Sequence, residues 1–123
     1  MRVVLILAAA LCAAAPVFSQ TRTLGPIMVS DLSIREGRIS FRADSNGCTD
    51  AGSFKVDIAK EQGAAPRVPH YRLTIRRVRV DDCKALVWDG VVIEMDLEKD
   101  LGLSGGYTLS VENRLFPTYR RTE

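Results

Sequence analysis

Apolar and polar residues alternate one by one along much of this chain, a pattern typical of β-strands that bury one face. In the longest such stretch, residues 70–83, the apolar side chains stand at odd positions up to Ile75 and at even positions from Val78. An unbroken strand would point Arg77 and Arg79 into the core, where an unpaired charge is costly. A β-bulge at the arginines would restore the alignment. We therefore predict one bulged strand whose arginines face water.

Six further runs predict short strands, and no stretch has the spacing of an amphipathic helix. Glycine in the polar segment 35–38, between two alternating runs, indicates a β-hairpin. Antibody domains have a tryptophan between their two cysteines. Here the one tryptophan, Trp88, comes after Cys48 and Cys83, so this order is absent. The pattern favours an all-β fold: a small antiparallel β-sandwich of about seven strands, immunoglobulin-like in the broad sense, with a small barrel as the alternative. The six further strands are predicted at residues 27–30, 32–34, 39–43, 54–58, 91–97 and 107–111.

The first 19 residues have the features of a secretory signal peptide. Arg2 supplies a positive charge, an apolar run too short to span a bilayer comfortably follows, and small residues precede a predicted cut between Ser19 and Gln20. A cut after Ala15 is the alternative. Residues 20–123 are then predicted to form a single domain, periplasmic or secreted. No second hydrophobic stretch is long enough to span a membrane.

Removal of the signal peptide leaves two cysteines, Cys48 and Cys83. An even number of cysteines in an oxidising compartment favours a disulfide, and two unpaired thiols are the alternative. In the chain-entropy model a bridge that closes a loop of this length contributes about 4 kcal/mol. That is a large share of the stability of a small domain.

Arginines are concentrated in and beside the long predicted strand, and they allow two interpretations. One is a basic patch that binds an acidic glycan or a lipid head group. The other is cross-strand pairing in which these arginines face Glu94 and Asp96, at about 0–1 kcal/mol for each exposed pair. The chain has 17 basic residues, of which Arg2 lies in the signal peptide, against 15 acidic ones, so the mature net charge of +1 argues against a dedicated nucleic-acid or membrane binder. The candidate ligand-binding residues are Arg72, Arg76, Arg77 and Arg79.

Metal and catalytic sites find little support in the residue spacing. The loop 44–50 carries oxygen side chains that calcium could use, yet their spacing is not that of an EF-hand. A turn is sufficient to account for the Asn-Gly pair in this loop. His70 is the only histidine, so zinc or copper would need other ligands brought together by folding. A hydrolase could combine His70 with Asp81 or Asp82, but no G-x-S-x-G elbow and no glycine-rich phosphate loop is present. We expect no cofactor, no metal and no catalytic residue.

The two cysteines and the strand before the second one resemble the arrangement in small exported bacterial domains of unknown function. The similarity extends over about residues 27–111, and it implies a periplasmic location without transferring an activity or a site. The residues that carry it are Asn46, Gly47, Cys48 and Thr49, then Leu73, Thr74, Ile75 and Arg76, then Asp82, Cys83 and Lys84.

The exposed loops are the expected contact regions, because loops on a rigid scaffold most often carry function. We expect a non-catalytic exported binding module that contacts a protein or a cell-envelope component through residues 44–52, 60–69 and 101–106. An inhibitor of an exported hydrolase belongs to this class. The alternatives are a binder of acidic ligands through the arginines and a small hydrolase. We expect no nucleic-acid partner, and a monomer or a weak homodimer.

Overall fold

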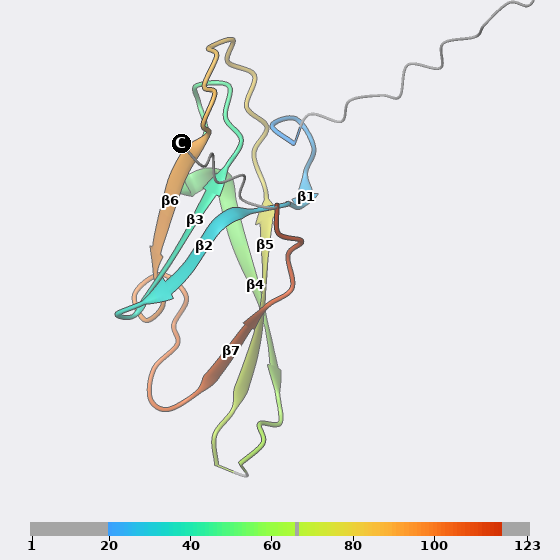
Figure 1. Ribbon diagram of the computed structural model, residues 1–123. Helices are drawn as coiled ribbons and strands as arrows, with labels where there is room; N and C mark the ends of the chain where they lie inside the picture. Colours follow the sequence, from blue (N-terminus) through green and yellow to red (C-terminus); the bar gives the residue numbers. More distant parts are fainter. Residues whose placement is uncertain (1–19, 66, 117–123) are drawn as a thin grey trace, which may run out of the picture.

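The computed structural model describes residues 20–65 and 67–116 (Figure 1). The predicted signal peptide lies outside these residues, so its cleavage and the resulting export stay predictions. No helix within the two described ranges is long and apolar enough to cross a membrane.

Within the described residues, seven strands form two sheets that face each other. One sheet has the order β2-β3-β6, with both pairs antiparallel. In the other, β5 pairs with β4 along one edge and with β1 and β7 along the opposite edge, and only the β5–β7 pair is parallel. The predicted small antiparallel β-sandwich is thus confirmed. The strands are β1 (Gly25–Pro26), β2 (Ser30–Arg35), β3 (Arg38–Ala43), β4 (Phe54–Glu61), β5 (His70–Arg77), β6 (Val91–Asp96) and β7 (Thr108–Val111).

The hydrophobic core lies between the two sheets. The longer strands contribute alternate residues to it, because successive side chains point to opposite faces. Phe41 of β3 meets Phe54 of β4 across the core, with ring centroids 5.5 Å apart in an edge-to-face arrangement. The other buried apolar residues are Ile27, Val29, Ile39, Ala43, Val56, Leu73, Ile75, Ile93, Met95, Leu97 and Leu103.

The hairpin predicted around residues 35–38 is confirmed. Strands β2 and β3 pair up to Arg35 and Arg38, which leaves a two-residue connection of Glu36 and Gly37. Both connecting residues have positive φ, 50° and 74°, as a turn that follows the right-handed twist of two strands requires.

The predicted bulge in the long strand is wrong. Strand β5 ends at Arg77, and its alternation continues without interruption from Leu73 through Ile75 to Arg77. Arg77 therefore points inward and is only 2% exposed. The change of parity after it marks the end of the strand, since residues 78–80 leave the sheet.

The edge strand predicted at residues 27–30 is wrong, because residues 27 and 28 form no strand and Ser30 already begins β2. Only Gly25 and Pro26 form β1, which pairs with the end of β5. Val29 makes an isolated parallel bridge to Leu115 instead of continuing this strand. The N-terminal segment thus runs from one sheet edge to the C-terminal segment before β2 begins.

Candidate functional site: a disulfide-anchored loop

Arg77 is a buried charge at the end of the sandwich where the two cysteines lie. Its Nη1 donates a hydrogen bond of 3.1 Å to the Thr49 hydroxyl, and its Nη2 donates one of 2.9 Å to the Asp44 carbonyl. The guanidinium carbon lies 4.8 Å from the centre of the Phe54 ring, a cation–π contact. These contacts offset much of the desolvation of the charge, although Nε is buried without a partner among the described residues.

Asp81 is the second buried charge and organises the surrounding loops. Its Oδ2 accepts a hydrogen bond of 2.6 Å from the Thr49 hydroxyl, so Thr49 links Arg77 to Asp81. The same oxygen accepts further hydrogen bonds from Ser45 Oγ, Asn46 N and Cys48 N, and Oδ1 accepts one from Cys83 N. We call Arg77, Thr49 and Asp81 the anchor network.

Both end groups of the anchor network are charged at physiological pH, but burial and hydrogen bonding shift their pKa values for different reasons. Burial alone raises the pKa of the Asp81 carboxyl, but the hydrogen bonds from the Thr49 hydroxyl and from three backbone N–H groups outweigh it and hold this pKa well below its ordinary value. Burial lowers the pKa of the Arg77 guanidinium, and the negative charges of Asp81 and Asp44 oppose this shift. An arginine nevertheless stays protonated at physiological pH.

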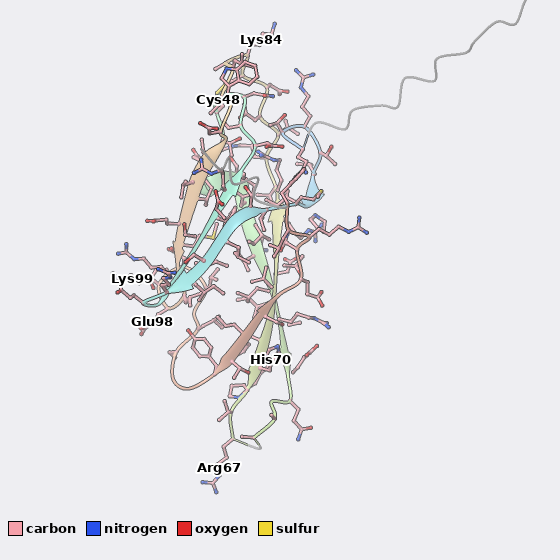
Figure 2. All side chains as sticks on the ribbon, in the orientation of Figure 1. Cys48, Arg67, His70, Lys84, Glu98 and Lys99 are labelled. Atoms are coloured by element: carbon pink, nitrogen blue, oxygen red, sulfur yellow. A yellow bond between two sulfur atoms is a disulfide. The ribbon has the colours of Figure 1, made fainter. Side chains whose placement is uncertain are left out.

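The predicted disulfide between Cys48 and Cys83 is present, with the two Cα atoms 5.7 Å apart. Cys48 lies in the connection from β3 to β4 and Cys83 in the connection from β5 to β6, so the bridge joins two segments that cross between the sheets. Figure 2 shows Cys48 and Lys84 at one end of the molecule and Arg67 at the opposite end. The bridge and the anchor network therefore fix the same end of the sandwich.

Residues 84–89, which we call the tip loop, project from this end (Figure 1). A hydrogen bond holds each end of the loop. At the start, Ala85 N donates to Asn46 O at 2.9 Å, and at the end, Arg42 Nη1 donates to Asp89 O at 2.8 Å. A turn closes the loop, with Gly90 N donating to Val87 O at 3.2 Å. The tip loop is thus tied down at both ends.

The tip loop carries the two most exposed large apolar side chains of the described residues. Leu86 is 73% exposed and Trp88 is 85% exposed. A tryptophan normally buries most of its surface, and Tyr and Trp are enriched where proteins meet partners. Sequence analysis missed this site. The available signal was an apolar run without alternation, directly after Cys83 and closed by an Asp-Gly turn.

The arginines do not form one exposed group. Arg72 pairs with Glu61 at 2.9 Å and with Glu112 at 3.2 Å, across both edges of β5. Arg76 pairs with Asp57, and Arg79 with Asp50. Pairing with acidic neighbours was anticipated, but the expected partners Glu94 and Asp96 were wrong, because β6 belongs to the other sheet. Arg77 points to the opposite side of β5, into the core.

His70 is far from the aspartates proposed to assist it. It begins β5, whereas Asp81 follows the end of this strand, whose 8 residues alone span roughly 25 Å. The His70 ring nitrogens instead contact the hydroxyls of Thr108 at 2.7 Å and Ser110 at 2.9 Å on β7. The strand direction therefore separates the proposed hydrolytic pair.

Three of the oxygen side chains in the loop considered for calcium are engaged within the protein. Ser45 and Thr49 donate to Asp81, and Asp50 pairs with Arg79. The sulfur atoms of Cys48 and Cys83 lie within 4.8 Å of an Asp81 oxygen, but both are bonded in the disulfide and offer no thiolate to a metal.

The three predicted contact loops lie in different places. Residues 44–52 pack beside the tip loop, so closely that a Cβ on Gly47 would lie 2.7 Å from Ala85 Cβ. Of residues 60–69, the first two end β4 and the described residues after them form the β4–β5 connection at the opposite end, whereas residues 101–106 lie in the β6–β7 connection. Comparisons with protein-family models, curated proteins and solved structures give no match. The geometry of the described residues is therefore the basis for inferring a function.

Proposed function

We propose that this protein is a non-catalytic binding module of an extracytoplasmic compartment that inserts Leu86 and Trp88 into an apolar pocket of a partner protein. The observation that carries the proposal is the exposure of both side chains, 73% and 85%, on one loop anchored by a disulfide. The disulfide also fits an oxidising compartment. Among the three loops expected from sequence, residues 44–52 contribute by supporting the tip loop.

The physical chemistry of the tip loop supports a protein as the partner. Binding energy in protein interfaces is concentrated in a few aromatic and apolar anchors that fill pockets, and tryptophan is prominent among them. A loop that is already held in position loses less conformational entropy on binding than a flexible one. Lys84 and Asp89, which flank the apolar pair, carry opposite charges and give the loop no net attraction to an anionic surface.

Crosslinking in the producing cell tests this proposal. Leu86→Ser with Trp88→Ser removes the apolar anchors while leaving the exposed loop otherwise intact, so we expect the crosslinked partner band to disappear. The matched control is Leu24→Ser with Leu115→Ser, which removes two side chains that are each 59% exposed elsewhere on the surface. The control should retain the band. Equal crosslinking of the tip variant and the control would contradict the proposal.

Trp88 also provides a direct spectroscopic readout, because it is the only tryptophan in the chain. Its emission in the free protein should be that of a water-exposed indole. Addition of the captured partner should shift the emission to shorter wavelength as the ring is buried. The same shift with phospholipid vesicles alone would contradict a protein partner and indicate a lipid surface.

A further inference from the structure

Strand β4 has an open edge. It pairs with β5 on one side, and no other described strand lies along its second edge. Ile27 N donates to Ile75 O at 3.3 Å and Glu112 N donates to Leu73 O at 2.9 Å, so the backbone groups of Leu73 and Ile75 face away from β4. Their antiparallel neighbours on β4, Ile58 and Val56, consequently direct their N–H and C=O groups outward.

A groove of about 370 Å³ lies beside this edge and is lined by residues of both sheets. Its apolar lining includes Val56 and Ile58 of β4, Met95 of β6, and Leu101, and its charged lining is Lys55, Glu94 and Asp100. Ile58 belongs to the inward-facing set of β4, yet it is 37% exposed because the sandwich is open on this side. The edge therefore offers both unpaired hydrogen-bonding groups and apolar surface to an added strand.

We propose that this edge binds β4 of a second copy of the chain, forming a two-fold symmetric antiparallel strand pair. Ile58 of one copy lies opposite Ile58 of the other, and Lys55 lies opposite Glu61 at both ends of the pairing. The outward backbone groups of Val56 and Ile58 supply the new hydrogen bonds. Lys60 lies opposite Val56, over which its methylene chain packs while the ammonium reaches water.

Charge complementarity and paired length together favour this occupant and this register. A pair centred on Val56 would also place Lys55 opposite Asp57, but it would pair only residues 54–58 of β4. Lys55 makes no ion pair with any other residue of the described ranges. In the dimer the Glu61 carboxylate, which also pairs with Arg72 of its own chain, lies directly across the strand pair from it. A shift by two residues that centres the pair on Asp57 would place two aspartates opposite each other, which is destabilising. The small formal net charge of +2 keeps repulsion between copies low.

Sedimentation equilibrium over a wide protein concentration range tests the charge pairing. The native chain should show a monomer–dimer equilibrium, and Lys55→Glu should weaken it about tenfold, because two attractive pairs become repulsive. Lys55→Glu combined with Glu61→Lys should restore it. Arg114→Glu makes the same charge change on an exposed residue at the opposite side of the sheet and should leave the equilibrium unchanged.

Two substitutions of Ile58 test the register and the edge. Ile58→Cys should give an intermolecular disulfide under mild oxidation, because residues directly opposite in such a pair have Cα atoms about 5.5 Å apart. Ile58→Pro should abolish dimers while preserving the melting temperature within a few degrees, since this N–H does not serve the β4–β5 ladder. A chain that stays monomeric at every concentration overturns the proposal. So does a dimer that survives Lys55→Glu and is lost with Leu86→Ser and Trp88→Ser, because the contact would then be the tip loop.

Discussion

At the scale of single residues, Asp81 has the largest influence on this structure. It accepts hydrogen bonds from the β3–β4 connection and from the β5–β6 connection. The Thr49 hydroxyl, which donates to Asp81, also accepts a hydrogen bond from Arg77. Breaking a buried pair by removing one partner leaves an uncompensated charge, which typically costs more than the intact pair contributes. Surface pairs such as Arg76 with Asp57 lack this property, because water replaces a lost partner.

Asp81→Asn should lower the free energy of unfolding by about 3 kcal/mol at neutral pH, because Arg77 loses one of its two nearby negative charges and the donors around Asp81 lose a charged acceptor. Chemical denaturation measures this difference. Asp57→Asn, which removes the partner of Arg76 at the surface, is the control and should cost about 0–1 kcal/mol. Similar losses for both substitutions would contradict the role assigned to Asp81.

The pH dependence of stability follows from the depressed pKa of Asp81. A carboxyl with a lower pKa in the folded state stabilises the fold at pH values above its unfolded pKa of about 3.9. This contribution is lost as the pH falls below about 4. Native stability should therefore decrease in acid, and the difference between the native chain and Asp81→Asn should shrink there. A difference that stays constant down to low pH would exclude this linkage.

At the scale of elements, the turn that ends the tip loop depends on Gly90. Its φ is +65°, and a Cβ at this position would collide with the Ala43 carbonyl at the end of β3. Gly102 has a similar φ of +69°, but a Cβ there would meet open space. Alanine at Gly102 would therefore meet only the strain of the backbone conformation, whereas alanine at Gly90 would meet this strain and the collision with Ala43.

Gly102→Ala should lower the free energy of unfolding by about 1 kcal/mol, because a non-glycine residue is then placed in the left-handed region. Gly90→Ala should cost distinctly more, because the β3–β6 pairing must shift to relieve the contact with Ala43. Thermal denaturation of both variants gives the comparison. Equal losses of stability in the two variants would show that the contact between a Cβ at position 90 and the Ala43 carbonyl is relieved at no cost in free energy.

At the scale of the whole molecule, the disulfide and the buried charges are concentrated at one end of the sandwich. The disulfide, the anchor network and the tip loop all lie where the chain crosses between sheets, whereas the β4–β5 connection lies at the other end. A rigid support at the end that presents Leu86 and Trp88 is what a preformed binding loop requires.

Replacing both bridged cysteines, Cys48→Ala with Cys83→Ala, should destabilise the fold by about 4 kcal/mol in the chain-entropy model. For a domain of this size that corresponds to a fall in melting temperature of about 20 °C. Calorimetry of the native and substituted proteins measures it. A fall of only a few degrees would mean that the anchor network holds the two crossing segments without the bridge.

The alternation of apolar and polar residues by itself determined most of the strands, the hairpin at Glu36 and Gly37, and the sandwich class. These features depend on neighbours in sequence: alternation assigns a residue to one face of a strand, and positive φ favours glycine in a two-residue turn. The two cysteines that follow the predicted signal peptide likewise predicted the disulfide, because they allow one pairing.

Only the tertiary structure decided the fate of Arg77, the role of Asp81 and the exposure of the tip loop. Sequence reasoning turned Arg77 outward because an unpaired buried charge is costly. The fold supplies its partners from Thr49 and Asp44, which lie 28 and 33 residues away along the chain. Leu86 and Trp88 stay in water because the crossing segment lies beyond the edge of both sheets. Pairing and burial depend on which distant segments meet, and no local pattern records that.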